Sequence, residues 1–359
     1  MTSALLRAVW MRGGTSKCWL FAESALPDRR TDRDEILVDA FGSASVRQLD
    51  GVGGGTSTTS KAVVVRDRAV RAGYVPYEFG QIAVDAPRVE WSSNCGNCAT
   101  GLGLYAIEMG WAVRTDSAHS VRLANILTGL EVQIRSPIAT TNGLADAALG
   151  VERVISIEFD ASSWTSPGRE LLPTGSRVER LEVGGVTATA TMIDAGTPAV
   201  FIDGRSLGVE ADSGVDELRL RSLVGALRDA RRVAAMRFGI HDSDGDAVPK
   251  VGVIGRATRG GPADISVRML SMSEIHPAIG LTSAVALAAA STIPHTVVSE
   301  AIEAVGSKPR ERLRIATGSG VVDARLGYTQ AGTLAGVEFV RSARRIAIAD
   351  VCVPTYARC

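Results

Sequence analysis

Short runs of β-branched and aromatic residues alternate with glycine-rich turns along the chain, a pattern typical of strands. In the first half the predicted strands are at about 4–11, 18–22, 61–65 and 79–91, with a Gly-rich turn at 12–17. Residues 27–42 instead have the spacing of an amphipathic helix that begins after Pro and Asp and ends at Gly42. In the second half strands are predicted at 178–193, 199–203 and 250–255, and a helix at 215–235.

Two further segments are apolar on nearly every side and predict buried helices. The first covers residues 98–111, and the second lies within "SMSEIHPAIGLTSAVALAAA", residues 271–290. A helix without a polar face must be enclosed by other elements. Asn94 and His276, which lie in the turns just before these two predicted helices, are separated by about half the chain. We therefore predict an α/β (α+β) fold with two lobes, each wrapping a sheet around one central helix.

The boundary between the lobes is predicted within residues 160–177, "DASSWTSPGRELLPTGSR". This gives an N-terminal lobe at 1–165 and a C-terminal lobe at 166–359, with the second central helix near 277–292 and the chain end free to cross back to the first lobe. Helix N-termini attract anions because of their unpaired N–H groups and the helix dipole. If both central helices begin at one cleft, we expect a substrate with several carboxylates there.

The composition disfavours several classes of protein. The net charge is zero, aromatic residues make up 5% and no block of Lys and Arg occurs, which argues against a nucleic-acid partner. No apolar run reaches the roughly 18 residues that a membrane span needs, so no membrane association is expected. Five cysteines in 359 residues do not make a disulfide framework, so we expect reduced thiols and a cytoplasmic protein. The expected partner is a small anionic substrate, and the expected assembly is a homodimer.

Lysine is scarce, which draws attention to Lys61. Only four of the 39 basic residues are lysines, and two of them, Lys17 and Lys61, end the similar phrases "GGTSK" and "GGGTSTTSK". A lysine, unlike an arginine, can be tuned to lose its proton. The loop at 51–56 lacks the G-K-[ST] of a phosphate loop, and a strand follows it. One interpretation is a solvated turn; the other is a carboxylate cradle made of backbone amides and the hydroxyls of Thr56, Ser57 and Ser60.

Cys95 lies in a polar turn directly before the first buried helix, where a helix N-terminus favours the thiolate. The alternative is a small buried hydrophobic residue. Cys95 and Cys98 form a C-x-x-C pair, but the other cysteines and the histidines are scattered, so no metal site is predicted. An oxidation-sensitive disulfide between the two is a further alternative. Near the second buried helix, His276 is a candidate for substrate contact or for helix capping, and Thr282 and Ser283 are candidates for substrate contact.

Seven motifs occur in order along the chain: "MRGGTSK" (11–17), "RQLDGVGGGTSTTSK" (47–61), "NCGN" (94–97), "LPTG" (172–175), "DAGTPAVFID" (194–203), "SMSEIHPA" (271–278) and "RSARRI" (341–346). Together they resemble the PrpF family, whose members are 2-methylaconitate cis–trans isomerases, methylitaconate Δ-isomerases and 4-oxalomesaconate tautomerases. Each motif alone is weak, but the resemblance covers essentially the whole chain.

The resemblance implies the diaminopimelate epimerase-like fold, with two pseudo-symmetric lobes that each have a mixed sheet around a central helix. It also implies a cofactor-independent isomerase that moves a C=C double bond by 1,3-proton transfer in an unsaturated di- or tricarboxylate, such as 4-oxalomesaconate, 2-methylaconitate or aconitate. The family's catalytic Lys and Cys fall on Lys61 and Cys95, with Lys61 favoured as the base. The substrate-binding residues expected on this basis are Thr15, Ser16, Lys17, Thr56, Ser57, Ser60, Asn94, Gly96, Asn97, His276, Thr282 and Ser283.

Two residues depart from the family pattern. Cys18 replaces the usual Gly after "RGGTSK", and Cys98 replaces an aliphatic residue after "NCGN". The second-lobe cysteine of true epimerases has no counterpart, because Gly280 or Leu281 lies near that place. An amino-acid epimerase or proline racemase is therefore the less favoured alternative, and a non-catalytic carboxylate-binding protein is another. The sequence leaves the identity of the acid open.

Overall fold

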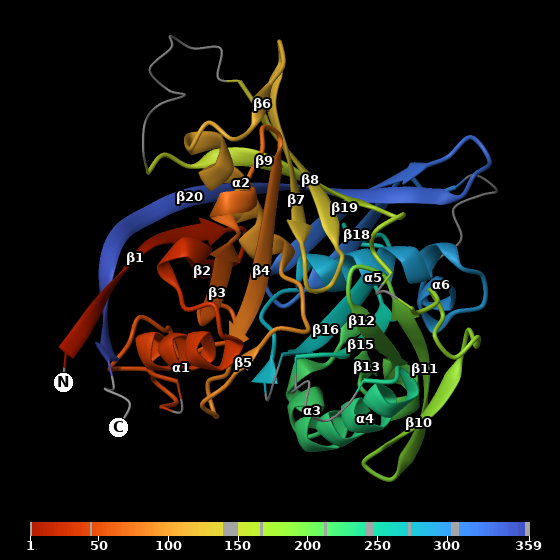
Figure 1. Cartoon of the computed structure of the whole chain (residues 1–359). Helices are drawn as coiled ribbons and strands as arrows, with labels where there is room; N and C mark the ends of the chain where they lie inside the picture. Colours follow the sequence, from red (N-terminus) through yellow and green to blue (C-terminus); the bar gives the residue numbers. More distant parts are fainter. Residues whose placement is uncertain are drawn as a thin grey trace. The chain divides into compact units, whose positions relative to one another are not determined.

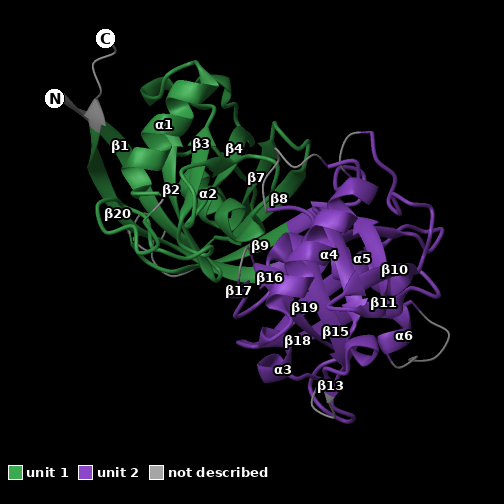
Figure 2. Ribbon diagram, turned by 90° about the horizontal axis from the view of Figure 1, so that it is seen from below, with its two compact units in different colours: residues 1–157, 340–359 green, residues 158–339 purple. Residues whose placement is uncertain are grey.

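The computed structural model describes residues 2–43, 45–138, 150–165, 168–211, 214–240, 247–271, 274–302 and 309–355. The chain divides into two compact units (Figure 2): unit 1 is residues 1–157 with 340–359, and unit 2 is residues 158–339. The boundary predicted from the sequence, between residues 165 and 166, lies eight residues further along the chain. Residues 158–165 group with unit 2 because Phe159 packs edge-on against Phe339 and the Trp164 carbonyl accepts a hydrogen bond from the Gly196 N–H.

Unit 1 contains a mixed sheet and two main helices (Figure 1). Its elements in chain order are β1 (Thr2–Gly13), β2 (Ser16–Ala22), η1 (Glu23–Ala25), α1 (Arg30–Phe41), β3 (Lys61–Val65), η2 (Asp67–Ala69), β4 (Tyr74–Ile82), β5 (Val89–Glu90), α2 (Gly96–Glu108), β6 (Val113–Arg114), β7 (Ala118–Asn125) and β8 (Glu131–Pro137). Two strands are shared with unit 2, namely β9 (Arg153–Asp160) and β20 (Leu334–Thr355). The C-terminal part of β20 pairs antiparallel with β1, so Thr2 lies opposite Thr355.

Unit 2 contains further parallel and antiparallel strands of the same 18-stranded hydrogen-bonded sheet. Its elements are β10 (Glu179–Val183), β11 (Val186–Asp194), β12 (Pro198–Asp203), η3 (Gly204–Leu207), β13 (Glu210–Ala211), β14 (Gly214–Val215), α3 (Glu217–Arg221), α4 (Val224–Arg237), β15 (Lys250–Arg256), β16 (Ile265–Ser271), β17 (Glu274–Ile275), α5 (Leu281–Thr292), α6 (Val297–Ala301), β18 (Arg312–Thr317) and β19 (Gly320–Tyr328). The predicted helix at 215–235 is therefore two helices, divided at Ser222 and Leu223. None of the described helices is long and apolar enough to cross a membrane.

The two units repeat one strand order. In unit 1 the order is β20-β1-β2-β3-β4-β7-β8, in which the β2–β3 and β4–β7 pairs are parallel and the others antiparallel. In unit 2 the order β10-β11-β12-β15-β16-β18-β19 has its parallel pairs at the same two places, β12–β15 and β16–β18. Along the chain, α2 lies between β4 and β7, and α5 lies between β16 and β18, so each helix connects the strands of the second parallel pair in its unit. The predicted pseudo-symmetric α+β fold is confirmed.

The two apolar helices are buried as predicted. Helix α2 packs on β1, β2, β3, β7 and β8, and α5 packs on β11, β12 and β19. Every residue from Gly96 to Leu104 and from Leu281 to Ala290 is buried. Helix α1 is partly exposed and ends as predicted at Gly42, whose φ of 65° lets the Ser43 N–H reach the Val38 carbonyl at 2.9 Å.

Gly13 allows β1 to pass close to the first turn of α2. A Cβ at this position would lie 2.0 Å from the Asn97 carbonyl oxygen and 2.7 Å from the Gly101 nitrogen, both backbone atoms that cannot rotate away. Gly13→Ala is therefore expected to lower the free energy of unfolding by about 1–3 kcal/mol, as other overpacking changes do. Denaturant unfolding measures this loss. In the control Gly225→Ala the new Cβ meets nothing within 4 Å, and an equal loss there would contradict the close-approach explanation.

Candidate active site

Strand alternation directs Cys18 and Lys61 towards α2. Trp19 and Ala62 are partners in the parallel β2–β3 pair, and both belong to the hydrophobic cluster around α1. Because successive strand residues point to opposite faces of a sheet, Cys18 and Lys61, which precede this pair, point to the face that α2 covers. Both side chains are buried, and Lys61 is only 8% exposed.

The Lys61 side chain is held by residues of β4. Its Nζ donates a hydrogen bond to Gln81 Oε1 at 2.5 Å and lies 5.1 Å from the centre of the Phe79 ring. Gln81 is the cross-strand partner of Lys61, and its own amide Nε2 donates to the Ser60 carbonyl at 2.9 Å. The second hydrogen bond fixes the direction of the Gln81 amide, so the amine of Lys61 has a defined position inside the unit.

Cys95 is the N-cap residue of α2. Its backbone is extended, with φ −136° and ψ 98°, and its Sγ accepts a hydrogen bond from the Cys98 N–H at 3.4 Å. Asn94 fixes the preceding turn, because its Oδ1 accepts hydrogen bonds from Asn125 Nδ2 and Thr128 Oγ1, each at 2.7 Å. Cys95 is half-buried, whereas Cys98 is fully buried.

Cys18, Cys95 and Cys98 form a hydrogen-bonded cluster of free thiols, with Cys98 in contact with both others. The hydrogen bond with the Cys98 side chain, followed by burial, raises the pKa of the Cys95 thiol well above its usual range; the Lys61 ammonium and the Cys98 N–H act in the opposite direction. A thiolate at this helix N-terminus was one of the two interpretations of the sequence, and these surroundings favour the thiol. The two departures from the family pattern are thus neighbours of the candidate catalytic cysteine.

Cys98→Val is expected to lower the pKa of the Cys95 thiol, because it removes the largest influence that raises it. Iodoacetamide reacts with the thiolate, so it should alkylate Cys95 slowly near pH 7, faster as the pH rises, and faster in the variant at equal pH. Peptide mass spectrometry in a Cys352→Ser background, which removes an exposed thiol, gives the rates. Identical rates with and without Cys98 would show that the thiol cluster does not control Cys95.

The two glycine-containing loops meet beside the site. The Lys17 N–H donates to the Thr58 carbonyl at 2.9 Å and joins the turn after β1 to the loop before β3. Gln48 organises this second loop from a buried position with φ 50°: its Oε1 accepts hydrogen bonds from Ser60 Oγ at 2.5 Å and from the Gly55 N–H at 3.0 Å. Thr56 Oγ1 lies 2.7 Å from Thr59 Oγ1. The loop is therefore internally hydrogen-bonded.

Asn97 presents a polar atom without a partner in this region. Its Nδ2 donates to Thr15 Oγ1 at 2.9 Å, but among the described residues its buried Oδ1 has no hydrogen bond. Gly14 lies against it with φ 50°, and a Cβ there would be 2.3 Å from that oxygen. The Oδ1 atom is thus a candidate acceptor for a ligand hydroxyl or a protonated carboxyl.

Unit 1 contains most of the predicted site residues together with Lys61 and Cys95: Thr15, Ser16, Thr56, Ser57, Ser60, Asn94, Gly96 and Asn97. Lys17 differs, because its Nζ lies 4.9 Å from the centre of the Trp10 ring, and Trp10 packs against the cluster around α1. The Lys17 ammonium is therefore directed to the face of the sheet opposite Lys61.

The remaining predicted residues belong to unit 2. His276 Nδ1 accepts a hydrogen bond from the Ala278 N–H at 2.9 Å, within the turn before α5. His276 does not cap this helix, because the N-cap of α5 is Gly280 and no described side chain caps it. Thr282 and Ser283 are buried in the first turn of α5, whose N-cap is Gly280. Gly280 thus has in α5 the position that Cys95 has in α2, and residues 158–339 contain no cysteine. Unit 2 supplies no second thiol.

Sequence reasoning missed Gln81, Gln48, Asn125 and Thr128. Gln81 carried a usable signal, since it is the one polar residue in the apolar run "FGQIAV" and lies two positions after Phe79, on the same strand face. The other three act through hydrogen bonds between segments distant in sequence. Among the described residues no group of three or more His, Cys, Asp or Glu is placed to hold a metal ion.

Comparison with known proteins identifies the family. The family profile described as "PrpF protein" matches residues 4–354. The (4E)-oxalomesaconate Delta-isomerase of Novosphingobium sp. (strain KA1) is 32% identical over 346 residues, covering 94% of each chain. The 2-methyl-aconitate isomerase of Shewanella oneidensis is 31% identical over 350 residues, covering 88% of this chain and 87% of that protein. A solved methylitaconate-delta-isomerase shares the fold, with a TM-score of 0.70 at 21% identity over 98% of this chain and 96% of that one. The chain belongs to the PrpF family.

Proposed function

We propose that this protein is a cofactor-independent isomerase that moves a C=C double bond by 1,3-proton transfer in an unsaturated di- or tricarboxylate. The observation that carries the proposal is that unit 1 places a buried lysine, Lys61, near enough to the Cys95 thiol at the N-terminus of α2 for a charge on Lys61 to act on that thiol. The relatives support the substrate class, because they are named for oxalomesaconate and 2-methylaconitate. Substrates of the 4-oxalomesaconate, 2-methylaconitate or aconitate type are therefore proposed.

The proposed reaction begins with neutral Lys61 and protonated Cys95. Lys61 Nζ removes a proton from the carbon γ to a conjugated carboxylate, and the electron pair of that C–H bond moves into a dienolate. The Cys95 S–H bond then breaks as its proton is transferred to the α carbon, which completes the shift of the double bond. Transfer of the proton from the Lys61 ammonium to the thiolate restores both groups. Rotation about the former double bond before reprotonation gives cis–trans exchange.

The surroundings of Cys95 fit the role of an acid. Its raised pKa keeps the proton on the thiol in the resting enzyme, ready for transfer. When Lys61 takes up the substrate proton it gains a positive charge, and that charge acts to lower the pKa of the Cys95 thiol. The first proton transfer therefore promotes the second, as expected for two groups that titrate as a coupled pair.

The substrate carboxylates are proposed to contact the first turn of α2 and the adjoining loops. The N-terminus of α2 offers N–H groups and the positive end of the helix dipole, and charge that develops on the enolate is stabilised by donors already in place. The proposed binding residues in unit 1 are Thr15, Ser16, Thr56, Ser57, Ser60, Asn94, Gly96 and Asn97, and those in unit 2 are His276, Thr282 and Ser283.

Gln81→Leu tests how far the position of Lys61 matters. The change removes the acceptor that holds Nζ, and a hydrogen bond to a charged group is worth about 1.5–3 kcal/mol. We expect kcat to fall roughly 10- to 100-fold with little change in KM. Gln81→Glu keeps an acceptor for Nζ, but its carboxylate favours the protonated form of the amine and cannot donate to the Ser60 carbonyl, so it should lose activity as well; wild-type kcat in Gln81→Leu would contradict a positioning role.

The proposal is tested by incubating the purified protein with 4-oxalomesaconate, 2-methylaconitate, methylitaconate and cis-aconitate and following the double bond by ultraviolet absorbance and proton NMR. Turnover of at least one acid is expected. Circular dichroism with L-proline and L-hydroxyproline tests racemisation, which is not expected because Gly280 stands where a second thiol would be needed. Racemisation without isomerisation would contradict the proposal, and binding of an acid without any proton exchange would identify a carboxylate-binding protein instead.

The proposal extends to the setting of the enzyme. Its expected partner is a small anionic substrate, with neither nucleic acid nor membrane involved, and the expected compartment is the cytoplasm. Free thiols at Cys18, Cys95, Cys98 and Cys352 support a reducing compartment. A homodimer is the expected assembly, and light scattering coupled to size-exclusion chromatography distinguishes it from a monomer.

A further inference from the structure

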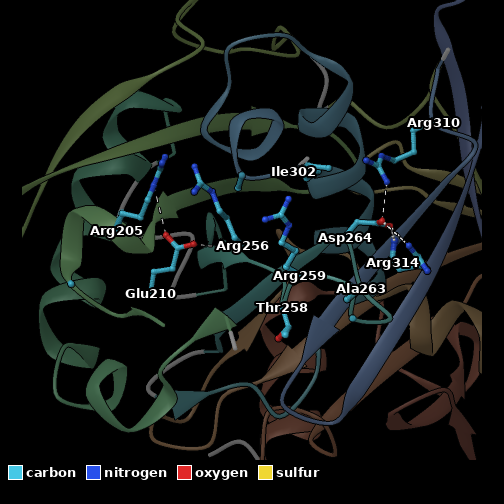
Figure 3. A pocket seen from close by; sticks show the side chains of 15 residues that line it. Arg205, Glu210, Arg256, Thr258, Arg259, Ala263, Asp264, Ile302, Arg310 and Arg314 are labelled. Atoms are coloured by element: carbon cyan, nitrogen blue, oxygen red, sulfur yellow. Dashed lines mark hydrogen bonds and ion pairs between the residues drawn. The ribbon is translucent and has the colours of Figure 1, made fainter. Parts of the chain in front are cut away.

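A cavity of about 780 Å³ in unit 2 has five arginines in its lining (Figure 3). Among its described lining residues the only carboxylates are Glu210 and Asp264, whereas five are basic: Arg205, Arg256, Arg259, Arg310 and Arg314. The lining thus has a formal excess of three positive charges. It shares no residue with the Lys61 site, and its arginines come from three separate chain segments, at residues 205, 256–259 and 310–314.

The two carboxylates position the arginines. Asp264 pairs with Arg310 at 2.9 Å and with Arg314 at 3.0 Å, and Figure 3 shows these two side chains on either side of it. Glu210 accepts a hydrogen bond from the Arg256 backbone N–H at 2.7 Å and lies 3.7 Å from Arg205 Nε. Asp264 is shared by two guanidinium groups, which leaves a net positive charge at that end of the cavity.

The cavity keeps a formal positive charge when nearby carboxylates outside its lining are included. Arg205 also pairs with Asp203 and is attracted by Glu300, and counting these two carboxylates outside the lining still leaves an excess of one positive charge. Arg256 is exposed, and no ion pair to its guanidinium occurs among the described residues. Arg256 is therefore the arginine best placed to contact a ligand.

The geometry points to a phosphorylated organic anion of nucleotide size as the ligand of this cavity. Guanidinium groups match phosphate oxygens with paired hydrogen bonds, and a concentration of them suits an anion with several charges. A volume of about 780 Å³ is within the range of sites for drug-sized organic ligands. Ala301 and Ile302 add an apolar wall that an organic group can cover. This site goes beyond the isomerase reaction, and its test measures binding rather than turnover.

Isothermal titration calorimetry at low ionic strength with ADP, pyrophosphate, citrate and adenosine tests the assignment on the full-length protein. ADP is expected to bind and adenosine not to bind, with affinity falling as salt rises because exposed charges are screened. Pyrophosphate is expected to bind more weakly than ADP, since it lacks the organic group. Lys61→Met should leave ADP affinity unchanged. Binding of citrate alone, or of none of these compounds at millimolar concentration, would overturn the proposal.

Variants locate the binding site. Arg256→Gln should weaken ADP binding at least about tenfold, the loss expected from one charge-assisted hydrogen bond, and Arg256→Lys should lose less because it keeps the charge. Arg232→Gln is the matched control, since Arg232 is an exposed arginine of α4 that pairs with Asp229 outside the cavity. Equal affinities for Arg256→Gln and Arg232→Gln would place any ADP elsewhere and overturn the assignment.

Discussion

Lys61→Met is expected to lower kcat/KM for the isomerisation by about a thousandfold or more, since a positioned general base contributes about 10²–10⁴ in rate. Methionine occupies a similar volume but cannot accept a proton. It also leaves Gln81 Oε1 without its donor, although the amide keeps its bond to the Ser60 carbonyl. Steady-state kinetics on the substrate found for the wild type measure the loss, and denaturant unfolding checks that the fold is retained.

Lys17→Met is the matched lysine control for this experiment. Lys17 ends the similar motif, but its ammonium lies over Trp10 on the other face of the sheet. We expect the Lys17 variant to keep most of the wild-type kcat. If the two lysine variants lost activity equally, a role specific to Lys61 would be contradicted.

Cys95→Ala is expected to reduce kcat by about 10²–10⁴, because the α carbon loses its proton donor. The variant also removes the N-cap of α2, whose Sγ accepts the Cys98 N–H, and loss of a cap typically lowers stability by about 0.5–2 kcal/mol. Cys95→Ser separates the two effects, since serine is a good N-cap but a much weaker acid than a thiol. We expect serine to restore stability without restoring activity.

Cys352→Ala controls for the loss of a thiol as such. Cys352 is an exposed residue of β20, so its removal should leave both rate and stability unchanged. Recovery of near wild-type kcat by Cys95→Ser would contradict an acid role for the thiol and would indicate that Cys95 acts only as a helix cap.

The sequence predicted those parts of the fold that depend on composition. The segments that became α2 and α5 are apolar all round, which requires enclosure by a sheet. By contrast, β6, β7, β8, β18 and β19 were not predicted, and β4 begins five residues before the predicted strand. Pro76 lies inside β4, and a proline argues against a strand when sequence alone is considered.

The candidate site was predictable where a residue type was unusual for the chain. Lys61 stood out because lysine is scarce, and Cys95 because of its polar turn before an apolar helix. The other contacts in the site depend on how the strands pair. Gln81 reaches Lys61 because the two residues are cross-strand partners in the antiparallel β3–β4 pair. The raised pKa of Cys95 depends first on a hydrogen bond with the Cys98 side chain and then on burial, and neither the direction of that side chain nor the burial can be seen in the sequence. Lys17 and Trp19 are two residues apart on one strand, so strand alternation alone places them on the same face of the sheet, opposite Lys61.

Deuterium incorporation from D₂O tests most directly whether Lys61 and Cys95 exchange protons with substrate carbon. Proton and deuterium NMR of the acid recovered from wild type should show deuterium at the α carbon, in step with the shift of the double bond. Acid recovered from Lys61→Met and from Cys95→Ala should show none. Full deuterium incorporation and turnover by either folded variant would remove that residue from the reaction and contradict the account.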